Sequence, residues 1–213
     1  MDKGKLLETV KKLKQEKRKF SQTIELVVTL KSIDLKKENV NFFIALPNRV
    51  RDKKICLFSE KSIPGGEKIF SRVVTKDQFS SLDKKESKKL AHDIDFFVSQ
   101  APVMASVAAS FGRMLGPLGK MPSPATGSVV TKLDDASLHE LVERLNRTVR
   151  LRTLKNDTSL KLAVGNQSMS EEHIMDNILA AEETITTGLP KGAENIKGFV
   201  LKTTMGKPIK LNL

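Results

Sequence analysis

The sequence has 213 residues and a formal net charge of +12, with 39% hydrophobic and 29% charged residues. A chain of this length can bury a core without a metal or a disulfide, and its single cysteine, Cys56, excludes an intramolecular disulfide and indicates a reducing compartment. The excess of positive charge favours a polyanionic partner, either nucleic acid or an anionic membrane.

The first twenty residues predict a basic amphipathic helix. Leu6, Leu7, Val10 and Leu13 follow helical spacing and form a narrow aliphatic stripe, which is typical of packing on a protein core rather than lying in lipid. This segment lacks the apolar region of a signal peptide, and no stretch approaches the about 20 apolar residues that span a bilayer. We therefore expect a cytoplasmic protein with no membrane contact.

Residues 23–31 predict a half-buried strand, because Ile24, Leu26, Val28 and Leu30 alternate with polar residues. Residues 40–46 predict a second strand that ends at a turn containing Pro47.

In the middle of the chain, short strands alternate with helices. We predict strands at residues 54–58, 72–75 and 94–98, a short helix after a loop at 64–66, and helices at 77–92, 102–111 and 137–146. This order favours an α/β domain with a mostly parallel sheet flanked by helices, Rossmann-like and three-layered.

The last third predicts a strand at 160–164, a helix that starts after Ser170 and runs to about residue 187, and a strand at 196–204. Together with the first fifty residues, these elements predict an α+β domain with a split sheet and helices packed on it. The domain would comprise residues 1–52 and 155–213, and the α/β domain would be an insertion at residues 53–154.

Metal binding and catalysis are poorly supported by the residue types present. The three histidines, His92, His139 and His173, are scattered and cannot build a zinc site with one cysteine. The aspartates at 93, 95, 134 and 135 have no nucleophile or base at an interpretable spacing. We expect no enzyme, no metal and no cofactor.

A loop rich in glycine and proline, at residues 112–122, resembles a phosphate-binding loop only superficially. Met114 stands where such a loop needs glycine, and Met121 where it needs serine or threonine. The loop is either a rigid turn or a secondary RNA or interdomain contact made by Arg113 and Lys120.

The two chain ends carry a more promising combination of residues. Segments 18–25 and 202–208 both lie at strand edges and mix cations, hydroxyls and one apolar residue that looks exposed, namely Phe20 and Met205. Cations neutralise phosphates and threonine hydroxyls reach 2′-hydroxyls, so the mixture suits RNA, although Phe20 would equally suit a core. Aromatic residues make up 5% of the chain, all phenylalanine, which favours a folded RNA target over stacking on single strands.

At these residues the sequence resembles a known family. The segments KFSQTIEL, LPNR, LGPLGKMPSP, AVGN and KTTMGKP are similar, in collinear order over nearly the whole chain, to the first large-subunit ribosomal protein, the L-one family, in its archaeal type. The resemblance implies two domains, the first built from both chain ends and bound to large-subunit ribosomal RNA. It also implies a stalk that helps to release deacylated tRNA from the exit site, repression of the protein's own messenger RNA, and a monomer when free.

Carried over by position, and with Lys202 added from the residue pattern, the RNA-binding set is Lys19, Phe20, Thr23, Glu25, Lys202, Thr204, Met205 and Gly206. Two departures from the family pattern put contacts in doubt. Leu118 replaces an arginine, and Gly198 stands where the family often has serine.

Two alternatives stay open. The α/β domain suits an enzyme acting on nucleotides, although the glycines of nucleotide-binding motifs are missing. A messenger repressor that never enters the ribosome would need the same RNA site.

Overall fold

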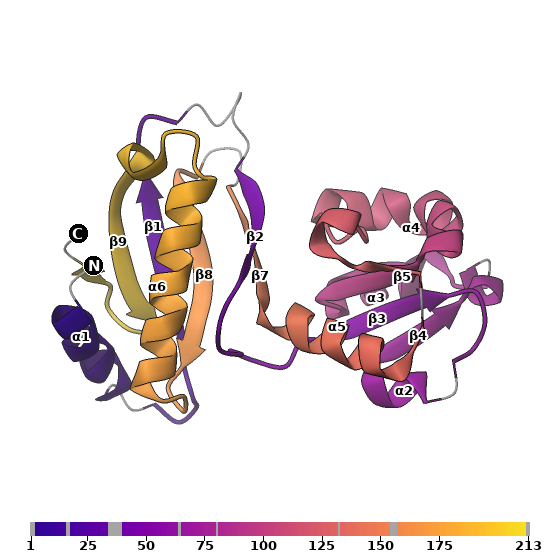
Figure 1. Cartoon of the computed structure of the whole chain (residues 1–213), viewed down its shortest axis with the longest axis horizontal. Helices are drawn as coiled ribbons and strands as arrows, with labels where there is room; N and C mark the ends of the chain where they lie inside the picture. The colour runs from indigo at the N-terminus through magenta and orange to yellow at the C-terminus, as the bar shows by residue number, and fades with distance from the viewer. Residues whose placement is uncertain are drawn as a thin grey trace. The chain divides into compact units, whose positions relative to one another are not determined.

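A computed structural model describes residues 3–15, 18–33, 40–63, 65–79, 81–131, 133–153 and 157–211. The chain divides into two compact units, Met1–Arg51 with Arg147–Leu213 and Asp52–Asn146 (Figure 1). The predicted second crossing, at residues 154 and 155, lies outside the described residues. The strand at 148–152 pairs with the strand at 41–45 inside the first unit, so the second crossing falls at residues 146–147 instead.

The first unit is an α+β domain. Its elements are α1 (Lys3–Gln15), β1 (Thr23–Leu30), β2 (Asn41–Ala45), β7 (Thr148–Arg152), β8 (Ser159–Asn166), α6 (Glu171–Gly188), β9 (Ile196–Thr203) and β10 (Ile209–Leu211). Four antiparallel strands form a sheet in the order β10-β9-β1-β8, while β2 and β7 form a separate ribbon. The split sheet expected from the sequence is present.

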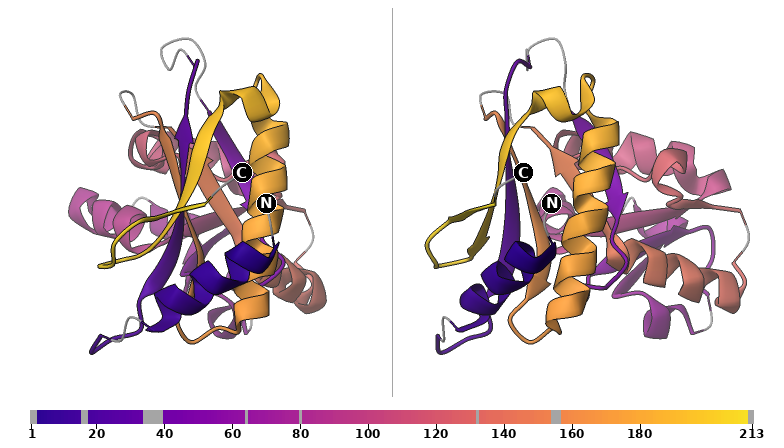
Figure 2. Two further views of the ribbon diagram at one scale, coloured as in Figure 1. Left: turned by 90° about the vertical axis from the view of Figure 1, so that its left-hand side faces the viewer. Right: turned by 60° about the vertical axis from the view of Figure 1, so that its left-hand side comes forward.

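Both long helices of this unit lie on one side of the four-stranded sheet (Figure 2). The predicted stripe of α1 is buried at Leu6, Val10 and Leu13, and the same core contains the inward-facing residues of β1. Ser170 is the N-cap of α6, and its side chain accepts a hydrogen bond from the His173 N–H. The opposite side of the sheet, the open face, has no helix of the described residues packed on it.

The second unit is a three-layer α/β domain. Its elements are β3 (Ile55–Ser59), α2 (Gly66–Ile69), β4 (Arg72–Thr75), α3 (Lys84–Asp93), β5 (Phe96–Gln100), α4 (Met104–Leu118), β6 (Val129–Val130) and α5 (Asp135–Arg147). All four strands are parallel, in the order β4-β3-β5-β6. One core contains Phe58, Val107 and Phe111, and a second contains Leu57 and Leu141, so the sheet has a buried layer on each face.

Two predictions of local structure in this unit were wrong. The helix expected at 77–92 is divided into a 3₁₀ turn (Lys76–Phe79) and α3. The loop expected from residue 112 is largely helical, because α4 continues through Gly112 and Pro117 and ends at Gly119, whose φ of 62° is left-handed. Burial of Val107, Phe111 and Leu115 at helical spacing outweighs the weak helix propensity of glycine and proline.

Candidate nucleic-acid interface

Strand pairing brings the two chain ends together. In the antiparallel register of β1 and β9, Ile24 lies opposite Thr203 and Glu25 opposite Lys202. The backbone N–H and the hydroxyl of Thr204 donate to the carbonyl of Thr23, at 3.1 and 3.3 Å. All eight predicted RNA-binding residues therefore lie where β1 begins and β9 ends. We call this set the chain-end patch: Lys19, Phe20, Thr23, Glu25, Lys202, Thr204, Met205 and Gly206.

A buried glutamine fixes the backbone under the patch. The side-chain oxygen of Gln22 accepts from the Met205 N–H at 3.1 Å, and the Gln22 N–H donates to the side-chain oxygen of Gln167 at 3.1 Å. The Gln167 N–H returns a bond to the Gln22 carbonyl at 3.0 Å. Sequence reasoning missed Gln22, which is only 1% exposed. The sequence contained a sign of this role, because Gln22 is a polar residue in the same inward-facing register as Ile24 and Leu26.

The patch exposes apolar surface to water. Phe20 is 55% and Met205 64% exposed, and these are the two exposed large hydrophobic side chains among the described residues. The sequence left open whether Phe20 belongs to the core, and its exposure answers that question. Since scattered exposed hydrophobics are ordinary, the significance lies in their position on two paired strand ends that are remote in sequence.

Charged side chains surround these two apolar groups. Lys19 is exposed, and it lines with Phe20 a hollow of about 360 Å³ whose other lining residues are Lys14, Arg18, Ser21, Gln167 and Ser168. The Lys202 ammonium lies 4.0 Å from the Glu25 carboxylate, and both side chains are about one-third exposed. A pair this exposed contributes about 1 kcal/mol or less to stability, so both groups can exchange partners for a ligand at small cost.

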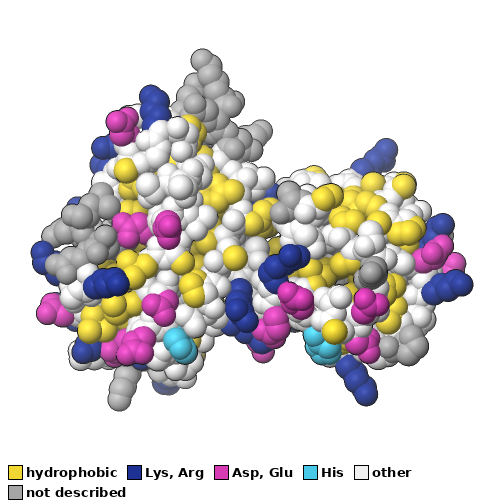
Figure 3. Space-filling model, in the orientation of Figure 1, with side chains coloured by type: hydrophobic (Ala, Val, Ile, Leu, Met, Phe, Trp, Pro, Cys, Tyr) yellow, Lys and Arg dark blue, Asp and Glu magenta, His cyan; other side chains and the backbone are white. Residues whose placement is uncertain are grey.

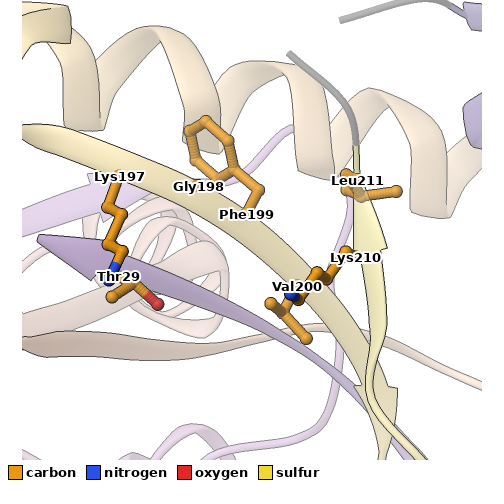
Figure 4. A pocket seen from close by; sticks show the side chains of 7 residues that line it. All are labelled: Thr29, Lys197, Gly198, Phe199, Val200, Lys210 and Leu211. Atoms are coloured by element: carbon orange, nitrogen blue, oxygen red, sulfur yellow. The ribbon is translucent and has the colours of Figure 1, made fainter.

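The open face continues from the patch along β1 and β9 to a second hollow, of about 530 Å³, lined by Thr29, Lys197, Gly198, Phe199, Val200, Lys210 and Leu211. Figure 4 shows Lys197 beside Thr29 and Lys210 beside Val200, while Phe199 points toward a helix on the other side of the strand. A Cβ atom built on Gly198 would meet nothing within 4 Å. Glycine at position 198, where the family often has serine, is therefore not needed to avoid a clash, and it leaves open space on this face.

Helix α6 and the open face of the first unit differ in charge. Helix α6 carries five carboxylate side chains and neither lysine nor arginine, and acidic side chains are prominent on the face seen in Figure 3. The open face bears Lys161, Lys202 and Lys210 on three of its strands, with Glu25 between them. A polyanion is therefore repelled by α6 itself and attracted to the lysines of the open face, while α1, on the same side as α6, carries five lysines and one glutamate.

The secondary contact predicted for the second unit has a different character. The Lys120 ammonium donates to the carbonyls of Ala91, His92 and Ile94, at 2.9, 3.3 and 2.6 Å, and so closes the C-terminal end of α3. Burial lowers the pKa of Lys120, while Asp95 and Asp93 oppose that shift. Arg113 is exposed on α4. RNA contact by Arg113 and Lys120 stays a prediction, and for Lys120 these bonds supply a structural role.

The described part of the chain offers no cluster of side chains for a metal ion. It contains no group of three histidine, cysteine, aspartate or glutamate side chains able to hold a metal. Cys56 is buried, and burial raises the pKa of its thiol to about 12. None of the helices described is long and apolar enough to cross a membrane.

Comparison with known proteins gives a consistent picture. Residues 10–207 match the model of the Ribosomal protein L1p/L10e family. Large ribosomal subunit protein uL1 of Nanoarchaeum equitans is 36% identical over 211 residues, covering 96% of this chain and 98% of the relative. The uL1 proteins of Methanothermococcus thermolithotrophicus and Thermoplasma volcanium are 34% and 35% identical, each covering 99% of this chain and 99% and 95% of the relative.

Proposed function

The chain belongs to the Ribosomal protein L1p/L10e family, in its archaeal type, and from this premise we propose that it is a structural protein of the large ribosomal subunit. It binds large-subunit ribosomal RNA directly through the chain-end patch and acts in the cytoplasm without catalysing a reaction. The observation that carries the proposal is the exposure of Phe20 and Met205 on paired strand ends that a buried hydrogen-bond network holds in place.

Each residue type in the patch has a physical role toward RNA. Lys19 and Lys202 neutralise phosphates, and the hydroxyls of Thr23 and Thr204 bond to 2′-hydroxyls. Phe20 and Met205 cover sugar or base surface, and Gly206 allows close approach of the backbone. Glu25 accepts hydrogen bonds from 2′-hydroxyls or base amines, exchanging its partner Lys202 for the ligand.

Two finer roles belong to the same proposal. The second unit offers a surface to exit-site tRNA and helps to release it. A messenger RNA that folds like the ribosomal site occupies the chain-end patch, so that the protein represses its own translation. Competition between the two RNAs for one site would support the second role, and simultaneous binding would contradict it.

The central test is binding to a stalk-region ribosomal RNA fragment across a salt series, comparing wild type with Met205→Asp and Lys120→Ala. Met205→Asp should weaken binding by about 30-fold or more, on the order of 2 kcal/mol, because it places a carboxylate in a desolvated contact. Lys120→Ala should bind almost as wild type does. Wild-type affinity for Met205→Asp at every salt concentration would remove Met205 from the interface and refute the assigned site.

Two further measurements separate the alternatives. Co-sedimentation with large ribosomal subunits distinguishes a ribosomal protein from a messenger repressor that acts alone. Saturable binding of a nucleotide would favour the enzyme that the α/β unit suggests.

A further inference from the structure

The ribbon of β2 and β7 has an outer face with its own recognition chemistry. Asn41 lies opposite Arg152 and Phe43 opposite Arg150, and these four residues define what we call the ribbon face. We propose that the ribbon face binds an unstacked RNA base on the guanidinium of Arg150, with the adjoining phosphate at Arg152. The inference rests on the proposed function, and it extends the RNA site beyond the chain-end patch.

The Arg150 side chain is held in a defined orientation. Its Nε donates to the side-chain oxygen of Asn41 at 2.9 Å, and its Cζ lies over the Phe43 ring, 5.8 Å from the centroid. A hydrogen bond on one edge and an aromatic ring on one face restrict the guanidinium plane. Guanidinium planes are one of the platforms on which proteins stack unpaired RNA bases.

The charge on this face favours phosphate. Arg150 and Arg152 are two residues apart on β7, so their side chains leave the strand on the same side. The pKa of Arg150 is lowered by burial and further by the positive charge of Arg152. An anion placed between two like charges relieves their repulsion.

Packing fixes which side of the ribbon is available. Ile44 and Leu151 on the inner side are buried in the core of the first unit, and the Phe42 ring packs on Gly188 at the end of α6. Phe43 and Arg150 alternate with these residues and point to the other side. The ribbon face therefore points away from the core of the first unit and from the end of α6.

The test uses the full chain and the stalk-region ribosomal RNA fragment. Arg152→Ala should weaken binding by about 3- to 10-fold and reduce the slope of log affinity against log salt by about 0.7–0.9, as expected for one phosphate contact. Arg150→Lys keeps the charge but removes the plane, so it should weaken binding by about 5- to 30-fold with the slope unchanged. Lys88→Ala, which removes one exposed charge from α3 in the other unit, is the matched control.

A second readout identifies the stacked base directly. One unpaired base should be protected from chemical modification at saturating wild-type protein and should lose that protection with Arg150→Lys. Arg152 is exposed, so its variant reports on binding even if changes at the half-buried Arg150 disturb folding.

The outcomes separate this inference from the proposed function. If Arg150→Lys and Arg152→Ala match wild type in affinity, salt slope and protection while Met205→Asp loses binding, the ribbon face is not an RNA site and the chain-end patch stands. If the two ribbon variants weaken binding while Met205→Asp does not, the ribbon inference holds and the assignment of the chain-end patch fails.

Discussion

The antiparallel sheet of the first unit and the parallel sheet of the second differ in how many faces they bury. In β1 buried residues alternate with half-buried ones, so one face packs on α1 and α6 while the other remains open. In β3 all five residues are buried, because helices cover both faces of the parallel sheet. A sheet with one open face can carry binding residues across its surface, whereas a domain whose sheet is covered on both faces can place them only at the sheet edges and on the helices.

Thiol accessibility should show this contrast most strongly. In a Val27→Cys variant the introduced thiol lies on the open face, while Cys56 lies in the covered sheet and is fully buried. Cys56 should react with a thiol reagent at least about 1000-fold more slowly, because it must wait for an opening that costs on the order of 5 kcal/mol. The measurement is a two-phase labelling curve in which each thiol is the other's control. A single fast phase for both thiols would contradict the burial of the parallel sheet.

Truncating one apolar side chain in each sheet should give the next largest difference. Leu57→Ala in β3 should lower the free energy of unfolding by about 2–5 kcal/mol, because it leaves a cavity in a packed core. Val27→Ala on the open face of β1 should cost about 1 kcal/mol or less. Denaturant unfolding of both variants tests the comparison, and equal losses would show that the open face contributes to packing as much as the covered one.

Lys120 tests whether a cation in a conspicuous motif stabilises the fold or binds RNA. Lys120→Met removes three hydrogen bonds to the end of α3 and should destabilise the protein by about 1–3 kcal/mol with no change in RNA affinity. Lys89→Met, which changes an exposed charge on the same helix, is the control.

The pH dependence of Lys120 has a defined sign. Because the pKa of Lys120 is lowered in the folded chain, the unfolded chain binds more protons between that pKa and the ordinary 10.5. Titration of Lys120 therefore adds stability as the pH rises through this window, and Lys120→Met should lack that gain. If Lys120→Met lost RNA affinity without losing stability, Lys120 would bind RNA rather than stabilise the fold.

Lys120 illustrates which features the sequence could predict and which it could not. The alternation of apolar residues was enough to predict β1. The N-cap serine and the glycine at the C-terminal end were enough to predict α6, because those signals are local. The predicted C-terminal end of α4 was wrong, because burial of residues such as Phe111 stabilises the helix and outweighs the local effect of Pro117. The partners of the Lys120 ammonium are at least 26 residues away in sequence, so no spacing rule reveals them.

The candidate site shows the same division between local and long-range information. Its residues were proposed from composition and resemblance, and the structure brings the two chain ends together by pairing β1 with β9. The supporting Gln22 was missed because its partners, Gln167 and Met205, are more than 140 residues away. Strand β7 was missed as well, although TVRLR alternates, because its pairing with β2 spans a hundred residues of inserted chain.

The smallest expected effect concerns an ion pair on the open face. At the start of β8, Asp157 accepts hydrogen bonds from the Ser159 N–H and hydroxyl, and its carboxylate lies 2.9 Å from the Lys161 ammonium. The bond from the Ser159 side chain, followed by that from Lys161, lowers the pKa of Asp157. Because a lowered carboxylate pKa favours folding only when the group is ionised, its contribution is present above pH 3.8 and is lost as the pH falls through the folded pKa.

Asp157→Asn should therefore cost about 1 kcal/mol or less at neutral pH, and the difference from wild type should vanish in acid. Thermal unfolding of both proteins at pH 7 and pH 2 measures it. A larger loss at neutral pH that vanishes in acid would mean that charges on the open face support the fold, whereas a pH-independent loss would mean that the effect does not come from the charge of Asp157. If the loss is small, Lys161 can give up Asp157 to a phosphate at little cost to stability, and the lysines of the open face are available for binding.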